Sequence, residues 1–200
     1  MELDEVIRRR RMYRRFSPDP VAPEVVDRIL DRARRSPSAG HTQGWAFLVL
    51  EGAEKEQFWQ LDSDASWRSS EQGRGLMAAS TVILPLVSES AYRARYSEAD
   101  KDAARVVGGP DHWQAPYWLV DGSFATMLLL LGVTAEGLGA LFFALHGPQR
   151  QTLSAFGVPP EWTALGAIAL GWPQQQAEAA GDSARRGRRP FSEVVHRGRW

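Results

Sequence analysis

The spacing of apolar residues predicts two helices near the N-terminus. Apolar side chains recur at helical intervals over residues 2–11, and a second apolar stripe of the same period runs over residues 24–35. Three prolines lie between these segments and exclude regular structure there. The Pro37–Gly40 run then ends the second helix in a turn of small residues.

Short apolar runs predict four strands. Trp45–Leu50 and Thr81–Val87 are of strand type, although Pro85 weakens the second because proline cannot donate to a ladder. Leu138–Leu145 and Ala164–Trp172 have the same character. The intervening stretches are expected to hold helical pieces at 52–78, loop at 92–118 and a helix near 149–156.

A longer helix is expected to begin at Asp121 or Ser123, either of which can cap it, and to end near Glu136. It is apolar nearly all round, so it must lie at the centre of the domain or between two subunits. The Phe124–Leu145 stretch resembles a membrane span in composition. Glycines interrupt it, however, which favours a buried helix, a turn and a strand. We expect no membrane insertion.

Composition narrows the chemistry. With 200 residues and 44% hydrophobic content, the chain can form one core, and we expect a single α/β or α+β domain over 1–200. There is no Cys, which excludes thiol nucleophiles, Cys-ligated zinc and iron–sulfur clusters, so redox chemistry would need a bound cofactor. The N-terminal sequence lacks the apolar stretch of a secretory signal, which predicts a cytoplasmic protein.

Charge is balanced overall but not locally. The formal net charge is zero, so no general field attracts a polyanion, and nucleic acid is not an expected partner. Arg supplies 22 of the 24 basic residues, and twelve of these lie in residues 1–15 and 185–200. These two basic ends could converge on one anion. A solvated basic surface or a nucleic-acid patch is the alternative explanation.

Four short segments carry candidate chemistry. If the first helix continues, Arg10 and Arg14 lie at i,i+4 and can reach one anion, and guanidinium forks match phosphate oxygens. Small residues after Pro37 let the backbone approach a flat ligand. A glycine turn at Gly137 follows the long helix, and a basic run starts at Arg186. Taken singly, each segment has an ordinary explanation as a solvated face, a loop, a helix end or a tail.

In this order, the four segments resemble the FMN-dependent nitroreductase family along nearly the whole chain. The family's R-x-S-x-[RK]-x-F is similar to Arg10, Met12, Arg14 and Phe16. Its P-S-x-x-N-x-Q-P-W is similar to Pro37, Ser38, His41, Gln43, Gly44 and Trp45. Its glycine-leucine turn and closing [KR]-x-R-x-P are similar to Gly137, Leu138, Arg186, Arg188 and Pro190. Met12, His41 and Gly44 depart from the usual Ser, Asn and Pro.

The resemblance implies an α+β fold, a three-layer sandwich of helices around a central, mainly antiparallel sheet, and a homodimer with FMN at its interface. The residues that it assigns to FMN are Arg10, Arg11, Met12, Arg14, Pro37, Ser38, Ala39, His41, Gly137, Leu138, Arg186 and Arg188. By that analogy the arginines hold the phosphate, the backbone around Ser38 lies along one flavin face, and the Gly137 amide donates to flavin N5. With Met12 in place of Ser, a backbone N–H would have to serve there.

The resulting hypothesis is an oxidoreductase that takes hydride from NAD(P)H onto FMN and passes it to a nitroaromatic, quinone or similar flat acceptor. No catalytic side chain and no metal are assigned. The aromatic residues expected to line the acceptor pocket are Tyr92, Tyr96, Trp113, Tyr117 and Trp118. The alternatives are a flavin-dependent dehydrogenase or oxidase of a specific metabolite, and a protein that holds flavin or deazaflavin without turnover.

Overall fold

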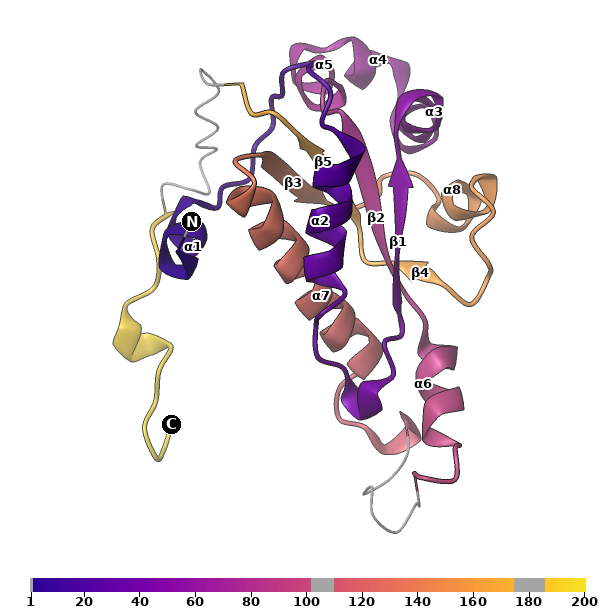
Figure 1. The fold of residues 1–200 in the computed structure, drawn as a ribbon, viewed down its shortest axis with the longest axis vertical. Coiled ribbons are helices and arrows are strands. Elements are labelled where there is room, and N and C mark those ends of the chain that lie inside the picture. The colour runs from indigo at the N-terminus through magenta and orange to yellow at the C-terminus, as the bar shows by residue number, and fades with distance from the viewer. Residues whose placement is uncertain (1, 102–109, 175–185) are drawn as a thin grey trace.

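A computed structural model describes residues 2–101, 110–174 and 186–200, and the chain forms a sheet with helices on both faces (Figure 1). The strands are β1 (Trp45–Leu50), β2 (Thr81–Val87), β3 (Gly139–Phe143), β4 (Thr163–Ala164) and β5 (Ala167–Gly171). Their order is β1-β2-β5-β3, with β4 paired to β2, and all of these pairings are antiparallel. The predicted α+β class and antiparallel sheet are confirmed.

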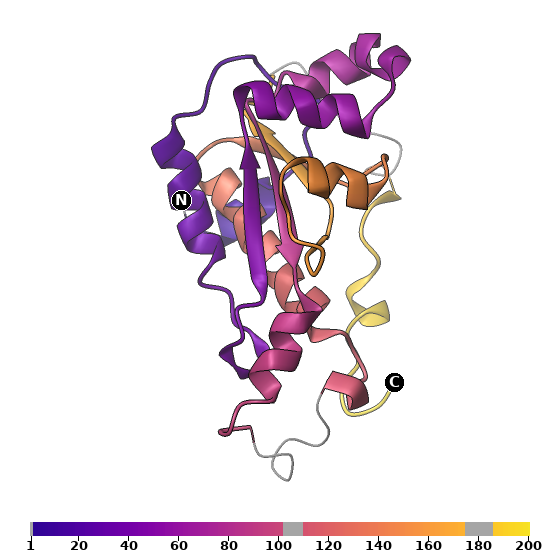
Figure 2. The same ribbon diagram turned by 90° about the vertical axis from the view of Figure 1, so that its right-hand side faces the viewer.

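Two helical layers enclose the sheet. The α-helices are α1 (Leu3–Arg9), α2 (Pro23–Ala33), α3 (Gly52–Asp62), α4 (Ala65–Ser69), α5 (Glu71–Met77), α6 (Glu89–Tyr96), α7 (Tyr117–Ala135) and α8 (Gln149–Ala155). Short 3₁₀ turns lie at η1 (Ala39–His41), η2 (Pro110–His112) and η4 (Phe191–Glu193). Helices α2 and α7 cover one face and α3 and α8 the other, with α6 at one end of the molecule and α4 and α5 at the opposite end (Figures 1 and 2).

The central strand β2 joins the two cores. All of its residues are buried, and successive side chains point to opposite faces, so Leu84 joins the core under α3 whereas Ile83 joins the core under α2 and α7. Pro85 lies between the stretch of β2 paired with β5 and the stretch paired with β4. Its missing N–H therefore costs no ladder bond on that side, and the predicted strand is confirmed around the proline.

Three predicted boundaries were wrong. The long helix begins at Tyr117 after Pro116, and Asp121 lies inside it, so neither Asp121 nor Ser123 is its cap. The 92–118 stretch includes the end of α6 and the start of α7, not only loop. The last predicted strand is split into β4 and β5 at Gly166, where a side chain would collide with β3.

Among the described residues, helix α7 is buried on one side and partly exposed on the other. Its small and apolar residues at Ala125, Leu129 and Val133 are buried against α2 and the sheet, whereas Phe124 and Met127 on the opposite side are about half exposed. By length and composition alone α7 could cross a membrane, but 44% of its most apolar window is buried within the protein. Core helices pass the same test, so the finding is weak support for a membrane span.

Candidate functional site

The turn before β1 has an unusual backbone. Gly40, His41 and Gln43 all have φ between +53° and +62°, in the left-handed region. For the two non-glycine residues this conformation is unfavourable and persists only where surrounding contacts enforce it. Several contacts are local, since the Gln43 N–H donates to Ser38 Oγ at 2.9 Å and the Thr42 hydroxyl donates to Ala39 O at 2.6 Å. The small-residue turn predicted from the sequence is thus a tightly defined structure.

Asp121 of α7 holds this turn in place by a hydrogen bond to its backbone. Its Oδ2 accepts hydrogen bonds from the Ala39 N–H and from the Tyr92 hydroxyl, both at 2.7 Å, and only 3% of the residue is exposed. Burial is the main cause that raises the pKa of Tyr92, and the neighbouring Asp121 carboxylate raises it further. The phenol therefore stays protonated and remains a hydrogen-bond donor to Asp121. Sequence reasoning assigned Asp121 to a helix cap. Its real partners are distant in sequence, and no local pattern reveals them.

Four of the five predicted acceptor-pocket aromatics form one cluster around Trp113. The rings of Tyr92, Tyr96 and Tyr117 meet it edge-on, with centroids 6.1, 4.9 and 5.1 Å away. Tyr92 is completely buried, so it has no surface with which to stack on a substrate in this structure. Tyr117 is 39% exposed. Trp118 lies outside this cluster, in a smaller cavity beside Arg93.

The N-terminal arginines are not arranged as one helical face. Helix α1 ends at Arg9, so the expected i,i+4 placement of Arg10 and Arg14 was wrong. The backbone instead runs alongside β3, where Met12 bridges Ala140 and the Tyr13 N–H donates to the Ala140 carbonyl at 2.9 Å. Because of this pairing, the positions of the Arg10 and Arg14 side chains are set by extended backbone and not by a helix.

Ion pairing separates the terminal arginines into two groups. Three have carboxylate partners at 2.7 to 3.3 Å, namely Arg9 with Glu5, Arg15 with Glu71 and Arg189 with Glu193. Within the described residues, the remaining terminal arginines form no ion pair; they include the four assigned to the phosphate, Arg10, Arg14, Arg186 and Arg188, and also Arg8, Arg11, Arg197 and Arg199. Arg10 also has a buried Nη1 with no hydrogen-bond partner there. A buried guanidinium nitrogen without an acceptor is costly, and an anion at this place would remove that cost.

Arg11 differs from these four arginines. Its guanidinium folds back onto the Arg8 and Arg10 carbonyls at 2.6 and 3.1 Å. Its donors are therefore partly used within its own segment.

The glycine turn after α7 is a regular helix ending. Gly137 has φ +77°, and its N–H donates to Thr134 O at 3.0 Å while the Leu138 N–H donates to Val133 O at 3.1 Å, the pattern of a Schellman motif. The positive φ thus has a local cause. A Cβ on Gly137 would meet nothing within 4 Å, so the backbone here is open to a ligand, but in this structure the Gly137 N–H that was expected to reach flavin N5 donates to Thr134 O instead.

Glu136, next to this turn, is held by α2. Its carboxylate pairs with Arg28 at 3.1 Å and Arg32 at 2.7 Å. The hydrogen bond from Arg28, followed by that from Arg32, holds the pKa of Glu136 below its usual range, although partial burial opposes them. The glycine turn is therefore anchored to the helical layer through the residue before it.

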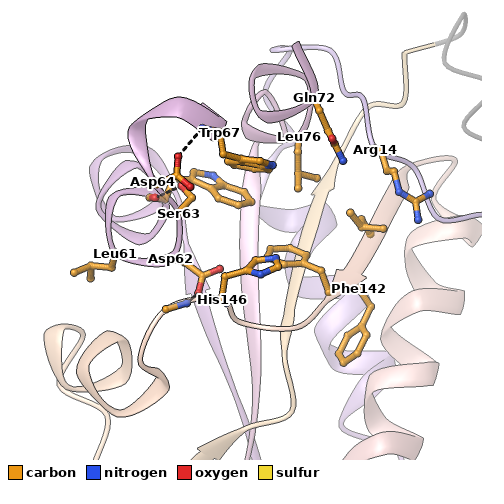
Figure 3. A pocket seen from close by; sticks show the side chains of 14 residues that line it. Arg14, Leu61, Asp62, Ser63, Asp64, Trp67, Gln72, Leu76, Phe142 and His146 are labelled. Carbon is orange, nitrogen blue, oxygen red and sulfur yellow. Dashed lines mark hydrogen bonds between the residues drawn. The ribbon is translucent and has the colours of Figure 1, made fainter. Parts of the chain in front are cut away.

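A cavity of about 560 Å³ opens between β3 and the α3–α5 segment (Figure 3). Arg14 lies on its rim beside Gln72, and aromatic side chains from α3, α4 and β3 form much of its wall. Arg14 is the one predicted site residue among its lining residues. The other lining residues come from segments with no distinctive motif, so sequence reasoning missed this cavity.

Within one chain the predicted cofactor residues fall into two separate groups. The turn at η1 lies beside α6, whereas Arg14 lies near α5, at the opposite end of the molecule (Figure 1). The tail from Arg186 to Trp200 is exposed and extends away from the sheet past α1 (Figure 1). One chain does not bring the turn and the arginines together.

Comparison with known proteins supports the family suggested by this architecture. The nitroreductase family matches residues 7–172, and the chain belongs to this family. A 5,6-dimethylbenzimidazole synthase of Rhodospirillum rubrum is 28% identical over 180 residues, covering 87% of this chain and 83% of that protein. A protein of Archaeoglobus fulgidus, provisionally named an NADH dehydrogenase/NAD(P)H nitroreductase, is 24% identical, covering 87% of each chain.

A solved structure shares the fold over nearly its full length. A protein of Exiguobacterium sibiricum, provisionally named a nitroreductase and crystallised with FMN, superposes with a TM-score of 0.75. The identity is 18%, and the match covers 98% of this chain and 97% of that one.

Proposed function

We propose that this protein is a cytoplasmic, FMN-dependent oxidoreductase that takes hydride from NAD(P)H and reduces a flat acceptor such as a nitroaromatic or a quinone. Membership of the nitroreductase family supports the flavin oxidoreductase class, and the FMN bound to the Exiguobacterium relative supports the cofactor. The provisional name of the Archaeoglobus relative supports a nicotinamide donor. The proposed partners are small molecules and a second copy of the chain, and neither nucleic acid nor a membrane is proposed as a partner.

The observation that carries the proposal is the buried Nη1 of Arg10, which has no acceptor among the described residues. Arg14, Arg186 and Arg188, which the family pattern groups with Arg10, also have no carboxylate partner there. This donor set fits the FMN phosphate, which offers several charged oxygens to guanidinium groups.

The residues of this chain would have distinct tasks toward FMN. The four arginines would bind the phosphate, with the Met12 backbone beside them, and Arg11 would contribute charge. The turn residues Pro37, Ser38, Ala39 and His41 would present backbone to one face of the ring system, and Asp121 would keep that turn in place. The open backbone at Gly137 and Leu138 would face the reactive edge of the flavin ring system. Bound FMN would supply the hydride chemistry, so no protein acid or base is required.

The proposed active unit is a homodimer. The turn lies beside α6, whereas Arg14 lies near α5 and the tail with Arg186 and Arg188 lies away from the sheet past α1, so we expect a complete site to take one group from each subunit. An apolar surface suited to the contact is present on α7 and α1, where Phe124, Met127 and Leu3 are 48 to 64% exposed. Exposed apolar surface of this kind marks protein interfaces.

A second candidate function is oxidation or fragmentation of one specific metabolite. The similarity to a 5,6-dimethylbenzimidazole synthase favours it, because that relative bears a biosynthetic name. In the third candidate function, a carrier, FMN would be bound without turnover.

Anaerobic stopped-flow mixing of the FMN-loaded protein with NADH or NADPH tests the proposal. Rapid loss of the oxidised flavin absorbance, followed by its return on adding a nitroaromatic or a quinone, is expected. Reduction by nicotinamide with no reoxidation by these acceptors would favour the metabolite-specific enzyme. Flavin that stays oxidised would indicate a carrier, and a protein that takes up no FMN would refute the flavin assignment altogether.

A further inference from the structure

The cavity between β3 and the α3–α5 segment has an aromatic wall. Trp59 stacks on Phe143, with ring centroids 5.6 Å apart and planes 10° apart, and Trp67 lies 5.8 Å from Trp59. Leu76 and Phe142 extend this apolar lining (Figure 3). A cavity of about 560 Å³ lies within the size range of small-molecule sites, and flat apolar walls suit a planar ligand.

Asp62 provides a buried carboxylate in this apolar setting. It is the last residue of α3, lines the cavity and is 1% exposed (Figure 3). Its Oδ1 accepts the His146 and Gly147 N–H groups at 2.8 and 3.0 Å, which holds the loop after β3. Its Oδ2 is buried and has no hydrogen-bond partner among the described residues. One oxygen thus has a structural task, whereas the other is an unused acceptor.

The charges around Asp62 leave this acceptor available. Asp64 caps α4 by accepting the Trp67 N–H at 2.8 Å, so it is engaged elsewhere (Figure 3). Arg14 and His146 also line the cavity, but neither pairs with Asp62 through its side chain in the described structure. An unpaired buried acceptor is destabilising, and an N–H donor from a ligand would recover that loss.

We propose that this cavity binds a planar aromatic ligand carrying an N–H donor, such as an aryl amine or an amino-substituted N-heterocycle, with the donor on Asp62 Oδ2 and the ring against Trp67 and Phe143, which are partly exposed and which the buried Trp59 supports from behind. The recognition uses one hydrogen bond to a carboxylate and stacking on aromatic faces. It goes beyond the proposed function, because Asp62, Trp67 and Phe143 were not assigned to FMN, although Arg14 on the rim was, so the two sites adjoin each other.

Calorimetric titration with 2-aminoquinoline tests the site, with 2-methylquinoline as the matched probe that replaces the donor by a methyl group. The titrations use the protein as purified and again with saturating FMN. We expect the amine to bind roughly tenfold or more tightly than the methyl compound, since a hydrogen bond to a charged group contributes about 1.5–3 kcal/mol. Equal affinities, or no binding of the amine, would overturn the proposal and leave water as the partner of Asp62.

Asp62→Asn sharpens the test, because an amide keeps one oxygen for the His146 and Gly147 N–H groups and places a donor where Oδ2 was. The variant should lose the preference for the amine while it stays folded and keeps its FMN affinity. Asp64→Asn is the control in the same loop and should keep the preference. An unchanged preference in Asp62→Asn would place the amine elsewhere and refute the proposal. Since FMN affinity is measured separately, failure of this site and failure of the flavin assignment give different results.

Discussion

The turn at Pro37–Gly44 and the arginine-rich ends are both proposed to bind FMN, but they differ in how far contacts within the chain fix their structure. In the turn, strained backbone is fixed by hydrogen bonds from its own side chains and by Asp121. In the ends, Arg10 and Arg14 have no carboxylate partner in the described structure, and the tail after Arg186 is exposed. The comparison indicates that the turn is already fixed within one chain, whereas the arginine-rich ends keep donors available for the anion that they are proposed to bind.

The strongest test of this comparison separates the two halves between subunits. A chain with Arg14→Ala and Arg188→Ala should be nearly inactive, and so should a chain with Ser38→Trp in the turn. A mixed dimer of the two would contain one doubly damaged site and one intact site. We expect isolated mixed dimers to recover about half of the normal flavin capacity and activity. Mixed dimers that remain inactive, although both parents fold and dimerise, would falsify the shared site.

Loss of Asp121 should damage the completed half. Asp121→Ala leaves the buried Tyr92 hydroxyl and the partly buried Ala39 N–H without their acceptor, which should cost about 2–4 kcal/mol in all. Thermal and urea unfolding should show a loss of this order together with weakened FMN binding. Tyr92→Phe, which removes only one donor, should cost about 1 kcal/mol. A loss for Asp121→Ala no greater than that for Tyr92→Phe would show that Asp121 does not hold the turn.

Removing unpaired arginines should weaken FMN binding without a comparable loss of stability. Arg14→Ala and Arg188→Ala should each lower FMN affinity by roughly ten- to a hundredfold, since each removes a charge-assisted contact of about 1.5–3 kcal/mol. Riboflavin, which lacks the phosphate, should bind both variants almost as well as the unaltered protein. Arg15→Ala and Arg189→Ala are matched controls, because these arginines already pair with Glu71 and Glu193. Equal losses across all four variants would point to general charge, not to a phosphate site.

The smallest expected effect concerns the pH dependence of stability at Asp62. Burial raises the pKa of Asp62, although the Gly147 and His146 N–H groups oppose the shift. The folded protein therefore resists ionising this carboxyl, and stability falls as pH rises from the unfolded pKa through the folded one. Asp62→Asn has no such proton to lose, so its melting temperature should gain relative to the unaltered protein as pH rises from 4 to 7. A melting temperature of Asp62→Asn that falls relative to that of the unaltered protein as pH rises would contradict the burial argument.

Several elements could be predicted from the sequence because their signals are local. The apolar runs of β1 and β2 gave the correct boundaries, since few other structures accommodate six or seven such residues between turns. The start of α7 was missed because Pro116 supplies no capping side chain, so Asp121 looked like the first polar residue before an apolar run. The helix at Glu89–Tyr96 was missed because its arginines and tyrosines give little amphipathic contrast.

The features of the site that were missed depend on tertiary contacts. Asp121 acquires its role only when Ala39 and Tyr92 approach it, 82 and 29 residues away along the chain. Likewise, the carboxylate of Asp62 meets the β3 wall only after the sheet forms. Periodicity and motif spacing report neighbours in sequence, so neither residue could be assigned a function before the fold was known.

Gly44, where the family pattern commonly has Pro, has a consequence for how this chain can evolve. The Tyr92 ring lies directly over Gly44, and a Cβ there would collide with it. A change to the usual Pro is therefore incompatible with Tyr92, whereas Tyr92 itself donates to Asp121. Among relatives, we expect positions 44 and 92 to vary together, with Gly accompanying Tyr and Pro accompanying a smaller side chain. A designer who grafts the common turn into this protein would have to exchange both residues at once.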